Sequence, residues 1–268
     1  MAAALLVYSL FPGDSSRMGL TCRLLGQGGS GGGGARRSGP AVELVVAQYS
    51  SNLSWVPGLL AALDEGTNLT VYSKGPSPYP GAVQLPNVGR EGHTFLYHLH
   101  TRYHSLAEVT LFVMGSAGQS KEKRRALREL VLGWRRARSR GMFCSGLDRH
   151  APPWGFALER WQGTTDSGGA GSHDAQERQR AGPQLQHAEL RPFGAWYAEY
   201  IGGGLPRAWC AEAFLAVHRS RAQQRPRAFY RALLEQLSVG ENLEAGHYLE
   251  RSWAAIFSLP AALPRCQL

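Results

Sequence analysis

The chain has 268 residues, 43% of them apolar, and a formal net charge of +9. This apolar content can bury a substantial core in one or two domains, and the charge favours anionic partners: phosphates, nucleotides, nucleic acid or anionic lipid. No run approaches the roughly 18 apolar residues of a membrane-spanning helix, so we expect no transmembrane segment. We expect a soluble intracellular protein, with organelle targeting by the acid-poor N-terminus as the alternative.

The four cysteines lie far apart, and no two of them form a CxxC pair. They are Cys22, Cys144, Cys210 and Cys266. This spacing favours neither a zinc site nor a disulfide framework. We therefore expect free thiols, and one long-range disulfide stays open as the alternative.

Two glycine-rich polar stretches divide the chain. The run GQGGSGGGGARRSG at 26–39 is too rich in glycine to fold, so we expect residues 1–40 to be a disordered leader and linker. A polar stretch without periodicity predicts a flexible loop at 164–183. A single domain is then expected over residues 41–260, followed by a short tail at 261–268.

Within this domain, strands and helices are predicted to alternate. Three short, nearly continuous apolar runs are typical of buried parallel strands: Val42–Ala47, Leu69–Tyr72 and Val109–Met114. Helical patterns are found at Pro57–Leu63, Glu91–Tyr103, Lys121–Arg138, 226–238 and 243–257. The order predicts an α/β fold with a mostly parallel sheet and helices on both of its faces.

In open α/β sheets, ligands bind beyond the carboxyl ends of the strands. Three loops are expected at that edge. They contain Gln48, Tyr49 and Ser50 after the first strand, Lys74 after the second, and the segment 115–118 after the third.

A further candidate for anion binding is the sequence Asn87-Val88-Gly89-Arg90, which leads into the helix after the second strand. A helix N-terminus offers free backbone N–H groups, and a guanidinium can bind phosphate in a bidentate way. We expect Asn87, Gly89 and Arg90, with Lys74, to bind an anion. The alternative is that Arg90 pairs with Glu91 and the glycines only make turns.

Glu250 is the candidate catalytic residue. Helical geometry places it next to the apolar side of the last helix, so the carboxylate should be at least partly buried, and burial raises the pKa of a carboxyl group. Such a group can act as a general base. The alternative is a structural ion pair or cap with one of the arginines.

Two other clusters are weaker candidates. His93, His100 and His104 share a helix face, but their spacing suits a solvated or hydrogen-bonded polar face better than a metal site. Lys121, Arg124, Arg128 and Arg135 form a basic stripe of the kind that binds anionic surfaces or is simply solvated. No aromatic interleaving accompanies the stripe, so nucleic-acid binding is not expected.

Several segments resemble a family known as a domain of unknown function, which occurs in algae, plants, fungi and some bacteria. They are VELVVAQYSSNLSWV, TVYSKG, LPNVGREGHTFLYHL, AEVTLFVMGS, RPFGAWYAEY, RPRAFYRALLEQLS and GHYLERSWAAIF, which together span residues 42–258. The family's architecture is similar to that of nucleotide-sugar glycosyltransferases of the type A fold.

The resemblance implies transfer of a sugar from a nucleotide donor to an acceptor that the sequence does not identify. It implies that Gln48, Tyr49 and Ser50 lie near the base, and that Asn87 and Arg90 lie near the ribose or phosphates. The chain departs from type A enzymes after the third strand, where Phe112–Ala117 contains no acid in place of the usual Asp-x-Asp.

Without that acid pair, no cofactor is evident, and binding of Mn²⁺ or Mg²⁺ has no support in the sequence. The expected partner is a nucleotide sugar or another anionic small molecule, and the sequence does not indicate an oligomeric state. We weigh a glycosyltransferase-like enzyme against a non-catalytic nucleotide- or glycan-binding module on the same fold.

Overall fold

Six strands form a mixed, mostly parallel sheet in the order β3-β2-β1-β4-β8-β5. In this computed structural model, β1 pairs in parallel with β2 and β4, and β2 pairs in parallel with β3, whereas β8 runs antiparallel to both β4 and β5. The strands are β1 (Val42–Gln48), β2 (Asn68–Ser73), β3 (Val83–Gln84), β4 (Val109–Met114), β5 (Met142–Cys144) and β8 (Leu215–His218).

The structure describes residues 40–159, 184–202, 206, 208–210 and 212–258. All of them belong to one compact unit, Arg36–Leu263. Residues 1–39 of the leader and linker predicted at 1–40, the whole of the loop predicted at 164–183 and the tail at 261–268 lie outside the described residues.

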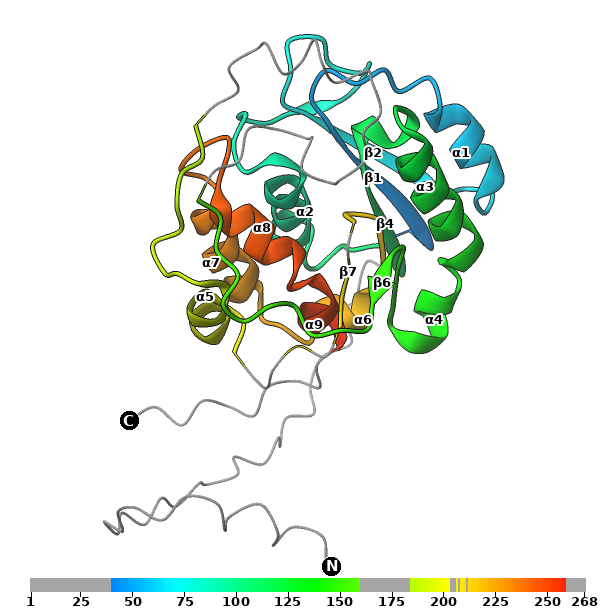
Figure 1. The fold of residues 1–268 in the computed structure, drawn as a ribbon. Coiled ribbons are helices and arrows are strands. Elements are labelled where there is room, and N and C mark those ends of the chain that lie inside the picture. The colour runs from blue at the N-terminus through cyan, green and yellow to red at the C-terminus, as the bar shows by residue number, and fades with distance from the viewer. Residues whose placement is uncertain (1–39, 160–183, 203–205, 207, 211, 259–268) are drawn as a thin grey trace, which may run out of the picture. The chain divides into compact units, whose positions relative to one another are not determined.

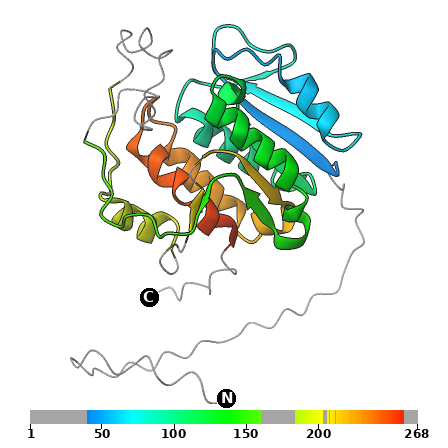
Figure 2. The ribbon, with the colours of Figure 1, turned by 45° about the vertical axis from the view of Figure 1, so that its right-hand side comes forward.

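The central strand β1 is buried on both faces, which is why its sequence does not alternate. Leu44 and Val46 pack into one core with α1 (Val56–Ala62) and α3 (Lys121–Gly133), while Val45 packs into the other. Figures 1 and 2 show the orange and red helices α8 and α9 on the opposite side of the strands from the blue helix α1.

The second core lies beneath the remaining longer helices. These are α2 (Arg90–Thr101), α5 (Phe193–Tyr200), α7 (Arg227–Gln236), α8 (Glu244–Glu250) and α9 (Trp253–Ser258). Shorter elements complete the unit: the 3-10 helix η1 (Gly115–Gly118), α4 (Arg136–Arg140), α6 (Arg219–Ala222), and an antiparallel pair of β6 (Leu147–Asp148) with β7 (Trp209–Cys210). No helix in the described part of the chain is long and apolar enough to span a membrane.

Two helices predicted as continuous are broken. The expected helix Lys121–Arg138 is divided at Trp134 and Arg135 into α3 and α4, and the expected helix 243–257 is divided at Arg251 and Ser252 into α8 and α9. In the first case the apolar period continues across the break because Trp134 and Ala137 are both fully buried. Periodicity reports which side chains face the core, so it does not detect such an interruption.

The cysteine expectation is wrong for one pair. Cys144 at the end of β5 and Cys210 in β7 form a disulfide across 66 positions of sequence, so the alternative left open is the correct one. Both side chains are buried. Cys22 and Cys266 lie outside the described residues.

Candidate functional site

A small cleft lies where the N-terminus of α2 meets α8. It brings together three of the residues selected from the sequence, Gly89, Arg90 and Glu250. Its other lining residues are Glu91, Gly92, Ala213, Leu243, Gly246, His247 and Trp253. The enclosed volume is about 30 Å³, which holds about two water molecules.

The backbone at the start of α2 is unusual. Gly89 has φ 54°, and Arg90, the only described non-glycine residue with a positive φ, has φ 49°. A Cβ on Gly89 would stand 2.4 Å from the carbonyl oxygen of Leu237, so only glycine fits at this position. The left-handed conformation of Arg90 costs roughly 1–2 kcal/mol. Strain of this kind concentrates at functional sites.

The Lys74 side chain stabilises this turn and does not line the cleft. Its Nζ atom donates hydrogen bonds of 2.5 Å to the carbonyl oxygens of Val88 and Arg90, and the side chain is buried. Burial lowers the pKa of Lys74 to about 7. Two of its donors thus hold the turn that positions Arg90, and the expectation that Lys74 also binds the anion stays a prediction.

Glu250 has the titration behaviour expected of a proton acceptor. Burial, together with the neighbouring Glu91 carboxylate, raises the pKa of Glu250 to about 7, although Arg251 and Arg90 act in the opposite direction. Its carboxyl group is thus divided between its two protonation states near neutral pH. A group in that condition can both accept and return a proton.

Other ionisable groups near Glu250 also have shifted pKa values. Burial and the positive charges of Arg90 and Arg251 lower the pKa of His247 to about 4, so this imidazole is neutral at pH 7. Burial raises the pKa of Glu212, whose charge also acts on Glu250. Two groups with shifted pKa values, Glu250 and His247, thus line one cleft, and such a combination marks a candidate functional site.

The other predicted binding residues lie outside the cleft. Gln48 is buried at the edge of the sheet. Its side chain donates a hydrogen bond to the carbonyl oxygen of Ser51 at 3.1 Å and accepts one from the backbone N–H of Tyr79 at 2.9 Å, so it stabilises this edge. Tyr49 is 53% exposed, Ser50 is exposed, and Asn87 is partly exposed. Lys74 connects the two areas, because its backbone N–H donates to the carbonyl oxygen of Gln48.

Metal binding finds no support in the described part of the chain. No group of three His, Cys, Asp or Glu side chains there could hold a metal ion. The segment after β4 forms η1, which contains no acid, and its Ser116 hydroxyl accepts a hydrogen bond from Lys123 at 3.0 Å.

The histidine-rich helix α2 also differs from expectation. The prediction was a solvated or hydrogen-bonded polar face, and His93, which is only 4% exposed, is not solvated. His98 lies fully buried in the core, where its ring contacts the Tyr72 hydroxyl at 3.1 Å and lies 3.6 Å from the Glu43 carboxylate. Burial lowers the pKa of His98 to about 3. His98 is thus a structural group of the interface between α2 and the sheet.

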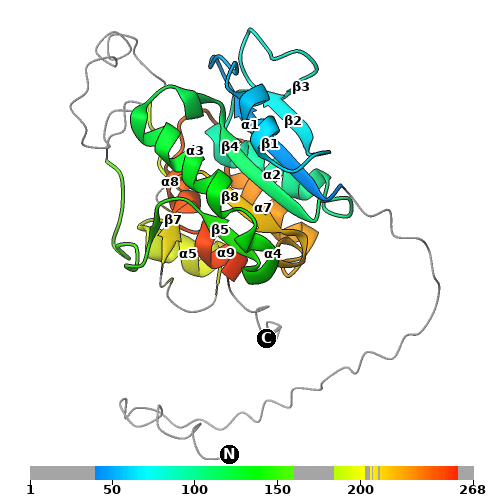
Figure 3. The same ribbon diagram turned by 90° about the vertical axis from the view of Figure 1, so that its right-hand side faces the viewer.

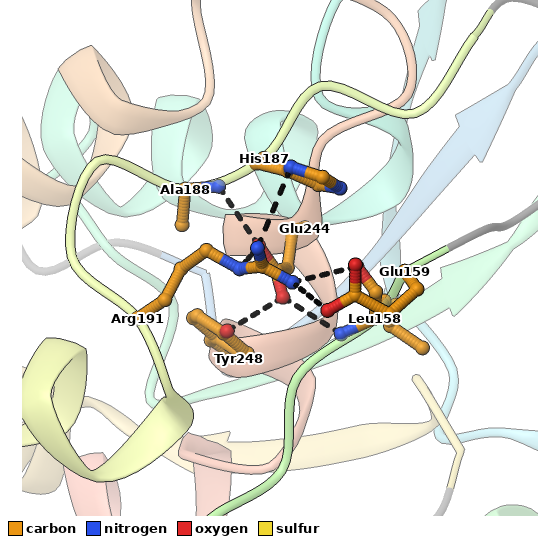
Figure 4. Close-up of polar contacts among 7 residues, drawn as sticks. All are labelled: Leu158, Glu159, His187, Ala188, Arg191, Glu244 and Tyr248. Atoms are coloured by element: carbon orange, nitrogen blue, oxygen red, sulfur yellow. Dashed lines mark hydrogen bonds and ion pairs between the residues drawn. The ribbon is translucent and has the colours of Figure 1, made fainter.

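A second carboxylate of α8, Glu244, was not identified from the sequence. It is fully buried and accepts hydrogen bonds from the backbone N–H groups of Leu158 and Ala188 and from the Tyr248 hydroxyl, at 2.7–3.0 Å. Arg191 completes the cluster with an ion pair of 2.9 Å (Figure 4). Leu158, Ala188 and Arg191 lie 53 to 86 positions away in the sequence, and Tyr248 belongs to the same helix, so no local motif indicates the cluster.

The hydrogen bonds explain why Glu244 titrates differently from Glu250. Burial alone would raise its pKa, but the donors from Tyr248, Leu158 and Ala188, with the Arg191 charge, outweigh burial and lower the pKa of Glu244. The carboxylate fixes two extended segments onto α8. We assign Glu244 a structural role and Glu250 the candidate functional one.

Comparisons with family models, with curated proteins and with solved structures give no match for this chain.

Proposed function

We propose that the cleft between α2 and α8 binds the anionic group of a nucleotide sugar and that Glu250 is the general base for transfer of the sugar. The observation that carries the proposal is the meeting of Arg90 and Glu250 in one cleft at a helix N-terminus. Arg90 supplies a permanent charge, and the backbone N–H groups of the first turn of α2 lack intrahelical acceptors. Glu250 supplies a proton acceptor with a pKa of about 7.

The proposed step is a displacement at the anomeric carbon. An acceptor hydroxyl gives its proton to Glu250, its oxygen bonds to the anomeric carbon, and the bond from that carbon to the phosphate oxygen breaks. The nucleoside diphosphate leaves with the bonding electrons, and Arg90 stabilises its developing charge. The segment Gly115–Gly118 directly after β4 contains no acid to bind a metal, so Arg90 has to compensate more of the diphosphate charge.

The size of the cleft limits what it holds. A volume of about 30 Å³ accommodates only the charged group, whereas pockets for whole ligands measure roughly 300–1,000 Å³. The remainder of the donor must extend along the sheet edge. The exposed Tyr49 there offers a ring on which the base can stack.

The first test concerns Arg90. Calorimetry with nucleoside diphosphates and nucleotide sugars, with and without Mn²⁺, should detect binding to the native chain. Arg90→Ala should weaken it by roughly 1.5–3 kcal/mol, the value of a hydrogen bond to a charged group. Arg90→Lys should restore only part of that loss, because a lysine cannot form the bidentate contact.

Arg102→Ala is the matched control, since Arg102 is exposed at the other end of α2. It should leave binding unchanged. If the native chain binds no nucleotide, or if Arg90→Ala unfolds it, Arg90 is structural and the proposal fails.

The second candidate is a non-catalytic binding module, favoured by the missing acid after β4 and by the small volume of the cleft. Donor hydrolysis separates the two functions. Turnover by the native chain that disappears in Glu250→Gln with binding preserved supports the enzyme, and binding without any turnover supports the module.

A further inference from the structure

The positive charge of the protein is concentrated in one short segment. Residues 121–140 contain nine Lys or Arg and two Glu, a net charge of +7 out of +9 for the whole chain. The segment comprises α3 and α4, which lie on the side of the sheet that faces the viewer in Figure 3.

The charge is also concentrated on one face of α3. Ala126, Leu130 and Gly133 are buried against the sheet and its neighbours. The opposite side of the helix is exposed. Its exposed cations and Leu132, with the two exposed arginines that directly follow Trp134, form what we call the basic face: Lys121, Arg124, Arg125, Arg128, Leu132, Arg135 and Arg136. Glu122 is exposed in the first turn of the same helix.

Contacts within the protein do not neutralise the basic face. Arg125 pairs with Glu129 at 3.2 Å, and its side chain is 81% exposed. Arg135 pairs with Asp64 at the edge of the face, with 62% of its side chain exposed. Exposed pairs of this kind are worth roughly 0–1 kcal/mol, so these arginines exchange readily to an external anion.

Leu132 distinguishes between the anionic partners. It is 79% exposed and is the most exposed large apolar side chain of the described residues, yet it lies among cations. A lipid bilayer offers both an anionic headgroup layer and an apolar layer beneath it. A nucleic acid groove offers no comparable apolar layer.

We propose that the basic face binds the surface of an anionic lipid bilayer. Its arginines and Lys121 contact lipid phosphates, and Leu132 enters the boundary between headgroups and acyl chains. None of these residues belongs to the cleft, so the inference does not depend on the proposed function.

The test is co-sedimentation of the full chain with vesicles of phosphatidylcholine alone or with about 30% phosphatidylserine. Binding is expected only to the anionic vesicles and should decrease as salt rises from about 0.05 to 0.5 M. The double variant Arg125→Glu/Arg128→Glu should bind at least roughly 30-fold more weakly, because each cation near the surface contributes about fivefold. Leu132→Ser should weaken binding a few-fold at every salt concentration.

The matched control is Arg231→Glu/Arg149→Glu. It changes the net charge by the same amount, and it also breaks an exposed ion pair between residues four apart, since Arg231 pairs with Glu235 as Arg125 pairs with Glu129. Val239→Ser is the control for Leu132→Ser, since Val239 is 71% exposed. Both controls should bind like the native chain, and circular dichroism should show all four variants folded.

Three results would overturn the proposal. Equal binding of the two double variants would show that net charge alone drives association. Unchanged binding of Leu132→Ser would remove the argument for a bilayer. Failure to bind anionic vesicles, with anisotropy showing Arg125- and Arg128-dependent binding of a labelled RNA or DNA oligonucleotide at about 0.15 M salt, would assign the face to nucleic acid.

Discussion

Glu244 and Glu250 are the first and last residues of the same helix, α8, and their carboxyl groups respond to burial in opposite ways. Glu244 receives three hydrogen bonds and an ion pair, and its pKa is lowered. Glu250 lies in the cleft beside Glu91, and its pKa is raised to about 7. How a carboxylate responds to burial therefore depends on whether donors are fixed around it. Of the two, Glu250, whose residue is partly exposed at the cleft, is the one left able to exchange a proton.

The largest effect is expected from removing the charge of Glu244. Glu244→Gln should lower the free energy of unfolding by roughly 3–5 kcal/mol, the cost of breaking a buried ion pair. Urea titration measures it. Because the folded pKa of Glu244 is lowered, its contribution is complete above the unfolded value near 4.5 and is lost as the pH falls through the folded pKa.

The native chain should therefore lose stability in acid more steeply than Glu244→Gln does. Glu235→Gln is the control, because Glu235 forms an exposed pair with Arg231 on α7 and should cost less than about 0.5 kcal/mol. A similar small cost for Glu244→Gln would mean that the cluster in Figure 4 does not hold the two segments.

The second prediction concerns Glu250, whose contribution to stability depends on pH in the opposite direction. The folded pKa of Glu250 is raised, so its contribution to stability is complete below the unfolded value of about 4.5 and is lost as the pH rises through about 7. Glu250→Gln cannot ionise, so at pH 8 it should be more stable than the native chain by about 2–3 kcal/mol, and near pH 4.5 the two should be similar.

Urea unfolding at the two pH values measures this difference, with the exposed Glu241→Gln as a control that should remain within about 0.5 kcal/mol at both. A Glu250→Gln variant that is less stable at pH 8 would show that the ionised group is held by a structural ion pair. That was the alternative considered for this residue.

The architecture could be predicted where local sequence determines it. β1 and β4 are continuous apolar runs because helices cover both faces of the sheet, and their parallel pairing follows from the helices between the strands. β5 and β8 were missed, since strands of three and four residues carry little pattern and pair only through long-range contacts. The type A relationship stays a prediction.

The candidate site, too, could be predicted only where local sequence determines it. Arg90 followed from a glycine turn before a helix, and Glu250 from its angular position, although the continuous helix assumed for that argument is broken at Arg251 and Ser252. The interior role of Lys74 could not be predicted, because the carbonyl groups that it contacts belong to a turn 14–16 positions away. Glu244 was missed for the same reason.

The smallest effect should come from removing one hydroxyl group, that of Tyr248. This change measures how much one hydrogen-bond donor contributes to the difference between Glu244 and Glu250. Tyr248 and Tyr230 are both fully buried, and each donates a hydrogen bond of 2.7 Å, Tyr248 to the Glu244 carboxylate and Tyr230 to the carbonyl oxygen of Ala222. Tyr230→Phe should cost about 1 kcal/mol at any pH between 3 and 8, the net value of a neutral hydrogen bond. Tyr248→Phe should cost about 1.5 kcal/mol at pH 7, since its acceptor is charged, and less in acid, where Glu244 is protonated and the charge is gone. Urea titrations of the two variants at several pH values measure these losses in the free energy of unfolding. A loss for Tyr248→Phe that does not depend on pH would mean that Glu244 is not the ionised acceptor. The contrast between Glu244 and Glu250 would then need another cause.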